Sequence, residues 1–227
     1  MKELPGANAD GVCYIFGACD LGEMVFSPGP DDCVIAADGG YRHVVRLGLS
    51  ADLVIGDFDS LGRPPEGETV ETFPKDKDDT DMMLAVKAGL RMGYSRFALY
   101  GGVGGRLDHT LANIQALAYL SKRGAEGVLV GGGMAVTALT DGELRFDKDK
   151  RGIVSIFCLG ESAFGVTLEG LRYPLDEATL TNDMPLGVSN AFTGEKSRVA
   201  VRKGTLAVLW YESPFVVWPE RNLFARG

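Results

Sequence analysis

Histidine and cysteine are scarce in this sequence of 227 residues, which contains two histidines and four cysteines. His43 and His109 do not form a pair with HExxH-type spacing, so a zinc site is not expected. No Gly-x-Ser-x-Gly elbow occurs, and covalent catalysis is not expected. The cysteines show neither a CxxC pair nor regular spacing, at Cys13, Cys19, Cys33 and Cys158. This pattern indicates a reducing cytoplasmic compartment rather than a disulfide framework.

Basic residues are outnumbered, because 23 Lys and Arg stand against 31 Asp and Glu, and the formal net charge is -8. Binding to nucleic acid or to an anionic membrane needs clustered cations, so neither is an expected partner. No apolar run near the N-terminus is long enough for a signal peptide or a membrane span. An anionic ligand must therefore be bound by positive charge at the site itself, and a metal ion is the simplest source of that charge.

The first part of the chain alternates short apolar runs with helical patterns. The runs are GVCYIFGA, CVIAADGG, ADLVIGDFDS, SRFALYGG and EGVLVGG, and continuous apolar strands are typical of a parallel sheet covered on both faces. Apolar residues recur at helical spacing from Met82 to Gly93 and from Leu111 to Gly124. The pattern predicts an α/β domain with a mainly parallel sheet over residues 1–143.

The remainder of the chain, residues 144–227, predicts an all-β domain. Its apolar runs are short, β-branched and separated by turns, as in GIVSIFCLG, FGVTLEGL and RVAVRKGTLAVLWY. We expect a hairpin turn at Asp141-Gly142, an exposed connection in DKDKR, and a turn at Lys203-Gly204.

Carboxylates gather where strands of the first domain lead into helices. Asp57 and Asp59 point to the same side of an extended chain, beyond the carboxyl end of a strand, where open α/β sheets bind ligands. Asp81 and Asp108 each stand at the start of a helix. Helix capping also explains acidic and Thr residues at such positions, as for Asp79 and Thr80. Several carboxylates at one edge repel one another, however, and Mg²⁺ that shares its ligands with substrate phosphates would relieve the repulsion.

Two glycine turns follow strands of the same sheet. YGGVGGRLDH places four glycines and Arg106 before a helix, which suits phosphate binding, although a ligand-free tight turn explains the glycines equally well. The segment matches neither GxGxxG in full nor a P-loop. ADGGYRH is a second turn of this kind, with Asp38 at its head.

The motifs ADGG, GDFDS, DKDDTD, GGxGGRLDH and a late Ser-Asn occur in an order that resembles the thiamine pyrophosphokinase family over nearly the whole chain. The resemblance implies an enzyme that transfers the diphosphate of ATP to the hydroxyl of thiamine, giving thiamine diphosphate and AMP, with Mg²⁺ required. It also implies that the C-terminal domain is a β-sandwich and that the chain forms a homodimer with thiamine bound between subunits.

The same resemblance implies roles for individual residues. Asp57, Asp59 and Asp81 would bind Mg²⁺, and Asp108 would complete the catalytic set. The ATP-binding residues would be Asp38, Gly39, Gly40, Gly101, Gly102, Gly104, Gly105, Arg106 and His109, the last of which is equally explained as a first-turn helix residue. The thiamine-binding residues would be Thr80, Asp81, Ser189 and Asn190. Two departures from the family pattern are Lys77, where some members have Gln, and GLRYPL, where some have Trp.

Three alternatives remain open from the residues. A pyrophosphokinase acting on a pterin or another alcohol would keep the same site. A metal-dependent phosphohydrolase would use the same carboxylates to activate water, although two histidines are few for two metals. A non-catalytic nucleotide-binding module would not need the carboxylates.

Overall fold

The computed structural model describes residues 11–22, 24, 26–57, 68–74, 78–211 and 218–224. Its chain forms two compact units. The first unit comprises residues 1–116 and 125–132, and the second comprises residues 117–124 and 133–227. None of the helices in these described ranges is long and apolar enough to cross a membrane.

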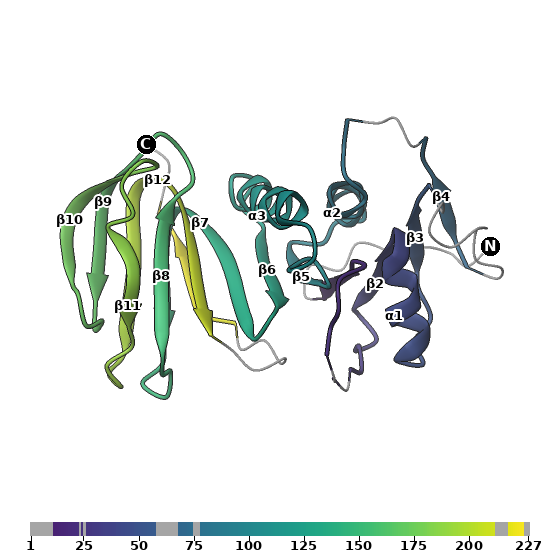
Figure 1. The fold of residues 1–227 in the computed structure, drawn as a ribbon, viewed down its shortest axis with the longest axis horizontal. Coiled ribbons are helices and arrows are strands. Elements are labelled where there is room, and N and C mark those ends of the chain that lie inside the picture. Colours follow the sequence, from purple (N-terminus) through teal and green to yellow (C-terminus); the bar gives the residue numbers. More distant parts are fainter. Residues whose placement is uncertain are drawn as a thin grey trace. The chain divides into compact units, whose positions relative to one another are not determined.

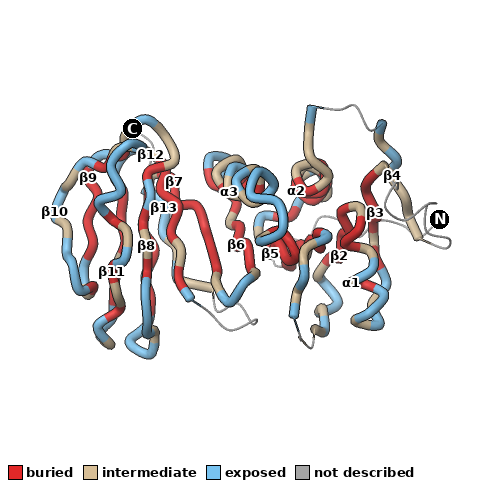
Figure 2. Tube along the Cα trace, viewed as in Figure 1, coloured by how far each residue is buried: buried red, intermediate tan, exposed pale blue. Residues whose placement is uncertain are grey.

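The first unit is built on a parallel sheet, as predicted. Its strands run in the spatial order β6-β5-β1-β2-β3-β4 (Figure 1). Every neighbouring pair is parallel. The strands are β1 Val12–Phe16, β2 Cys33–Ala37, β3 Leu53–Gly56, β4 Val70–Thr72, β5 Arg96–Tyr100 and β6 Glu126–Gly131. The middle strands β1, β2, β3 and β5 are almost entirely buried, which explains their continuous apolar sequences (Figure 2).

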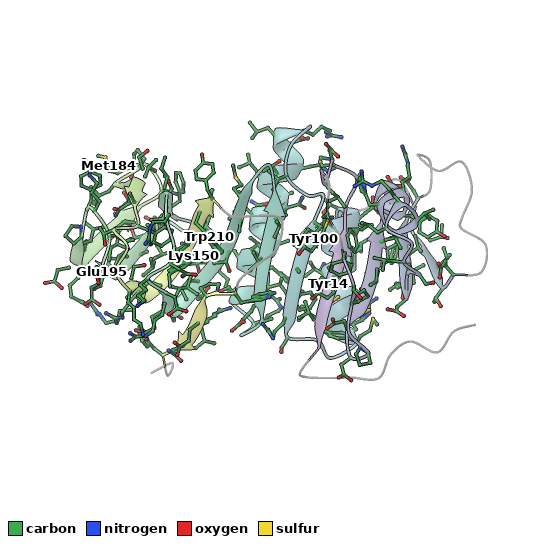
Figure 3. All side chains as sticks on the ribbon, turned by 90° about the horizontal axis from the view of Figure 1, so that it is seen from below. Tyr14, Tyr100, Lys150, Met184, Glu195 and Trp210 are labelled. Carbon is green, nitrogen blue, oxygen red and sulfur yellow. The ribbon has the colours of Figure 1, made fainter. Side chains whose placement is uncertain are left out.

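An aromatic cluster packs against the central strands. Tyr14 on β1 and Tyr100 on β5 lie on neighbouring strands with ring centroids 6.4 Å apart (Figure 3). Phe26 packs edge-on against Tyr14 at 4.5 Å and Phe16 at 5.5 Å. These contacts join the segment after β1 to the centre of the sheet.

The helices begin and end where the sequence predicts. The 3-10 turn Asp38–Gly40 leads into α1 Tyr41–Arg46, and the longer helices are α2 Asp81–Arg91 and α3 Leu107–Ser121. Gly93 and Gly124 follow α2 and α3 with φ of 87° and 80°, conformations that end a helix at little cost only for glycine.

The second unit is antiparallel and contains β7 to β13. The strands are β7 Met134–Phe146, β8 Ile153–Cys158, β9 Ser162–Glu169, β10 Leu175–Thr181, β11 Gly187–Ala191, β12 Ser197–Tyr211 and β13 Glu220–Leu223. The two long strands β7 and β12 pair with each other, with one irregularity between Val201 and Thr205. Before that point β12 also pairs with β9, and beyond it β12 pairs with β8.

Two sheets result, because β7 and β12 change partners part-way along their length. One sheet continues through β9 to β10, and the other through β8 to β11. Aromatic side chains join the two: the Phe146 ring at the end of β7 lies 5.4 Å from Trp210 on the far half of β12 and 5.2 Å from Phe192 after β11. The predicted β-sandwich is confirmed.

The turns expected at Asp141-Gly142 and Lys203-Gly204 are wrong, because both pairs lie inside long strands. Asp141 has φ of 48° and Gly204 has φ of 123°, and the Gly204 N–H donates to the Asp141 carboxylate at 2.9 Å. The residues that suit a reverse turn are used here to bend two paired strands at the point where they change sheets. The DKDKR connection between β7 and β8 is mainly exposed, as predicted.

One buried carboxylate organises the face of β7. Glu143 accepts hydrogen bonds from Arg198 at 2.6 Å, Arg145 at 2.8 Å and Asn222 at 3.3 Å, and its side chain is 8% exposed. Burial by itself would raise the pKa of Glu143, but the hydrogen bonds from Arg198, Arg145 and Asn222 outweigh it and leave the pKa below its usual value of 4.5.

We expect Glu143→Gln to lower the free energy of unfolding by about 1–3 kcal/mol at pH 7, since both arginines lose the charge of Glu143 but remain partly solvated, and Arg198 keeps its pair with Glu169. Because the folded state lowers the pKa, the stabilisation by Glu143 is complete above the usual value and disappears as pH falls through the folded value. Urea unfolding followed by tryptophan fluorescence, at pH 7 and again below pH 4, measures the difference. Glu177→Gln is the control, because its pair with Arg202 is exposed and should contribute less than about 0.5 kcal/mol. An equal loss in both variants would contradict the prediction.

Candidate active site

A pocket of about 390 Å³ lies at the carboxyl edge of the first unit's sheet. It is formed where β1, β2 and β5 end and where α2 and α3 begin. The lining residues come from these junctions: Gly17, Ala18, Cys19, Ala37, Asp38, Thr80, Asp81, Met82, Gly101, Gly102, Gly105, Arg106, His109 and Asn113. Open α/β sheets bind ligands at this edge, since each strand delivers its following loop there.

Carboxylates reach this edge from three segments. Asp38 follows β2 and Asp81 begins α2, and both line the pocket. Asp57 directly follows β3, whose last residue Gly56 is so close to Asp38 that a Cβ on it would lie 3.1 Å from the Asp38 Cα. Asp38 itself has φ of 45°, a conformation that few residues other than Gly, Asn and Asp adopt.

Asp59, the partner predicted for Asp57, lies outside the described residues. Within the part of the chain that the structure describes, no three His, Cys, Asp or Glu side chains gather tightly enough to hold a metal ion by themselves. The donor chemistry nevertheless suits Mg²⁺, because Asp38, Asp57 and Asp81 offer only hard carboxylate oxygens. Mg²⁺ is usually held by one or two carboxylates, with water and substrate phosphate completing the octahedron.

The start of α2 separates capping from pocket residues. The Thr80 hydroxyl accepts a hydrogen bond from the Met83 N–H at 3.2 Å, so Thr80 is the N-cap of the helix as well as part of the pocket wall. Asp79 forms an ion pair with Lys87 at 2.6 Å. Of these two carboxylates, Asp81 lines the pocket and Asp79 does not.

Arg106 and Asp108 form a pair at the start of α3. The Arg106 Nε and Nη2 donate to the two carboxylate oxygens of Asp108 at 3.1 and 2.5 Å. The hydrogen bond to Arg106 lowers the pKa of Asp108, and the same contact raises the pKa of Arg106. Arg106 and His109 line the pocket, whereas Asp108 is not part of the pocket wall and holds the guanidinium by its two hydrogen bonds. A guanidinium held in this way keeps its charge and its orientation, and both favour the binding of an anion.

The predicted glycines serve different structural purposes. Gly101, Gly102 and Gly105 line the pocket. Gly104 turns the loop with φ of 99°, and its N–H donates to the Thr110 hydroxyl at 3.3 Å. Gly39 and Gly40 are buried, and a Cβ on Gly40 would lie 1.8 Å from the carbonyl oxygen of Phe16. The close approach of the turn to the end of β1 therefore requires glycine at position 40.

Among the pocket residues that sequence reasoning missed, two have side chains that form hydrogen bonds with the glycine loop. Asn113, 5% exposed, donates its side-chain amide to the Gly102 carbonyl at 2.7 Å. Cys19 donates its N–H to the Gly101 carbonyl at 2.9 Å and its thiol to the Gly104 carbonyl at 3.2 Å. A signal for Asn113 was present, because this amide stands one helical turn before Leu117 on the apolar face of α3.

The late Ser-Asn pair lies on β11 in the second unit. Asn190 is 3% exposed, and its side chain donates to the Tyr173 carbonyl at 2.7 Å and accepts from the Tyr173 N–H at 2.9 Å. Ser189 is exposed with φ of 59°, and its N–H donates to the Ser155 hydroxyl at 3.1 Å. Asn190 thus fixes the backbone of Tyr173, while Ser189 and the Tyr173 ring, 56% exposed, face outward.

Comparison with known proteins gives two matches to family models. Residues 30–129 match the thiamin pyrophosphokinase catalytic domain, and residues 142–206 match the thiamin pyrophosphokinase vitamin B1 binding domain. The thiamine pyrophosphokinase of Bacillus subtilis (strain 168) is 26% identical over 182 residues, which are 77% of this chain and 85% of that protein.

Solved structures show the same fold. The crystal structure of the Bacillus subtilis thiamine pyrophosphokinase has a TM-score of 0.78 at 23% identity, and the match covers 89% of this chain and 99% of that one. The thiamin pyrophosphokinase of Candida albicans has a TM-score of 0.68 at 13% identity, covering 90% of each chain. The two matched domain models follow one another in family order, span well over half of the residues and coincide with the α/β and β-sandwich parts, so this chain belongs to the thiamin pyrophosphokinase family.

Proposed function

We propose that the sheet-edge pocket binds ATP and that the chain transfers its terminal diphosphate to the hydroxyethyl oxygen of thiamine, giving thiamine diphosphate and AMP. Family membership supports this activity and gives no support to a pterin kinase, a phosphohydrolase or a non-catalytic module. The observation that carries the assignment to this pocket is that Asp38, Asp81, Arg106 and the glycine loop line one cavity.

Arg106 and the loop Gly101 to Gly105 are proposed to bind the phosphates of ATP. Attack of an alcohol on the β-phosphorus needs in-line positioning and relief of negative charge on the phosphate oxygens. Arg106 is suited to this task because Asp108 occupies its Nε and Nη2, which fixes the plane of the guanidinium. The N-terminus of α3 adds its partial positive charge at the same place.

Asp57, Asp59 and Asp81 are the proposed ligands of Mg²⁺, and Asp38 lines the same pocket as Asp81. The ion, when bound, would neutralise charge on the phosphates. Asp81 has a second proposed role, which is to orient the thiamine hydroxyl or accept its proton. Since a loose phosphoryl-transfer transition state asks little of a base, Asp81→Asn should cost less than the loss of a metal ligand.

Ser189 and Asn190 are proposed to contribute to thiamine binding, along with Thr80 and Asp81. In the second unit, Asn190 would act by holding Tyr173, and Ser189 would offer its hydroxyl directly. The exposed Tyr173 ring is suited to contact the cationic thiazolium of thiamine. The four cysteines are free, which agrees with the proposed cytoplasmic location.

A homodimer is proposed to form through the outer face of β8 and β11. Exposed apolar side chains occur on β8 and next to β10 and β11: Ile153 and Phe157 lie on β8, Tyr173 before β10, and Met184 and Leu186 before β11. Met184, labelled in Figure 3, is 63% exposed. A monomer gains nothing from such a group in water, whereas a second copy of this chain would bury it.

We expect Phe157→Glu to shift the chain from dimer to monomer, because a charge at the centre of an apolar interface loses its hydration without gaining a partner. Size-exclusion chromatography with light scattering measures the mass. Phe164→Glu, at an exposed phenylalanine on β9, is the matched control and should leave the mass unchanged. A wild-type protein that is monomeric at micromolar concentration would refute the proposal.

An acceptor-exchange assay tests the activity. The protein is incubated with ATP and Mg²⁺, with thiamine, a pterin alcohol or no acceptor, and the products are separated by chromatography. AMP that appears only with thiamine is the expected result. AMP with the pterin alone would select the other kinase, and phosphate released without an acceptor would select a hydrolase.

A further inference from the structure

The loop Gly101 to Gly105 is held by hydrogen bonds to three of its carbonyl oxygens. Gly101 accepts from the Cys19 N–H, Gly102 from the Asn113 amide, and Gly104 from the Cys19 thiol. These donors come from the segment after β1 and from the second turn of α3. The loop is therefore anchored from two sides through three of its carbonyl groups, and the Gly104 N–H is bonded to the Thr110 hydroxyl.

Anchoring the carbonyls also determines where the amides point. In a planar trans peptide, the C=O of one residue and the N–H of the next point in opposite directions. The N–H groups of Gly102 and Gly105 therefore point away from the Cys19 anchors, and both residues belong to the pocket wall. The positive ends of these peptides are then available to an anion, while the negative ends are tied to the protein.

Asn113 has the strongest of these anchors and the most buried donor. At 2.7 Å its bond is the shortest of the three, and a Cβ on Gly102 would lie 2.8 Å from the Asn113 Nδ2. Without this donor, the buried Gly102 carbonyl would have to find another partner, and it could turn into the pocket because Gly102 and Asn113 both line it. A carbonyl oxygen turned into the pocket would repel phosphate.

We propose that Asn113 is a positioning residue for phosphate binding: its amide holds the Gly102 carbonyl out of the pocket so that the loop meets the ATP phosphates with N–H groups. This inference rests on the proposed function of the pocket. The hydrogen bond of the Asn113 side chain is to the loop, so Asn113 acts through the loop. Its effect should therefore fall on the affinity for phosphate rather than on thiamine.

The test measures binding of ATP and of inorganic tripolyphosphate by calorimetry with Mg²⁺ present, together with KM for ATP and for thiamine. Asn113→Leu, which keeps the size but not the donor, should weaken both phosphate ligands at least about tenfold and leave KM for thiamine within about twofold. Cys19→Ala removes only the thiol anchor and should weaken tripolyphosphate about two- to threefold, whereas Cys19→Ser should recover most of that loss.

Asn190→Leu is the matched control, because Asn190 is equally buried and also donates to a backbone carbonyl at 2.7 Å, but in the second unit. It should change KM for thiamine and leave tripolyphosphate binding unaltered. Gln115→Ala, on the exposed face of α3, should change neither KM for thiamine nor tripolyphosphate binding.

If Asn113→Leu binds tripolyphosphate as tightly as the wild type, the inference is overturned and the proposed function stands. If the Cys19 variants keep wild-type affinity while Asn113→Leu does not fold, the inference is likewise overturned. If the wild type binds neither phosphate ligand, both fail.

Discussion

Replacing Asp57 with asparagine should lower the rate of AMP formation with thiamine about 10²- to 10³-fold at saturating Mg²⁺, with the fold intact. Asp57 directly follows β3, and Asn keeps its shape while removing the charge that we propose holds the cation. The loss corresponds to that of one preorganised group that stabilises transition-state charge. Because the side chain is only partly buried, the variant should unfold at nearly the wild-type temperature.

Asp79→Asn is the control for this experiment. Asp79 belongs to the same acidic segment as Asp81, but its carboxylate pairs with Lys87 and is not part of the pocket wall. We expect its activity to stay within about twofold of the wild type, because a partly exposed ion pair contributes little. A second readout is Mn²⁺ binding in the presence of ATP, followed by electron paramagnetic resonance, which should weaken in Asp57→Asn alone. Near-normal AMP formation by both Asp57→Ala and Asp59→Ala would remove the assignment of metal ligands.

Gly40→Ala should prevent the first unit from folding correctly and reduce the yield of soluble protein. The backbone of Gly40 has φ of -61°, which alanine adopts freely, so the effect is one of space alone. The added Cβ would lie 1.8 Å from the Phe16 carbonyl oxygen and 2.5 Å from its carbon, and neither backbone atom can move without disturbing the central strand β1. A loss of more than about 4 kcal/mol is expected for an overlap of this kind in a buried position.

Thermal unfolding followed by far-UV circular dichroism measures this loss, with soluble yield as the first indicator. Gly160→Ala is the matched control, because a Cβ at Gly160 meets no atom within 4 Å and its backbone is outside the left-handed region. The control should fold like the wild type. If Gly40→Ala is as stable as Gly160→Ala, the close packing of the ADGG turn against β1 is wrong, and the glycine would have to be explained by ligand binding instead.

The local elements were largely predictable, because their causes are local. Continuous apolar runs mark β1, β2, β3 and β5, and the Thr80 cap and the glycines after α2 and α3 set the helix limits. The placement of Asp38 and Asp81 at one edge also followed from the rule that parallel strands end together. The identity of the substrate was inferred from the resemblance to the family and not from the periodicity of the sequence.

Long-range pairing decided what local rules could not. Asp141-Gly142 and Lys203-Gly204 have the composition of reverse turns, yet each continues its strand because the two sites face each other and bend together. Asp79 and Asp81 are two positions apart in the sequence, yet Asp79 pairs with Lys87 whereas Asp81 lines the pocket. An amide on the apolar face of α3 marks Asn113 as unusual, but its partner, the Gly102 carbonyl, lies eleven positions away in a loop and could not be predicted locally.

By itself, the sequence of this protein determined the type and order of its elements and the set of acidic and glycine residues at one sheet edge, since propensity, periodicity and strand direction depend on near neighbours. Only the tertiary structure decided which of those residues line the pocket and which side chains hold them in place, as Asp108 holds Arg106 and Asn113 holds Gly102. The reason is physical: a carboxylate or an amide takes its role from the partner that packing brings within hydrogen-bond distance, and that partner is chosen by the whole fold.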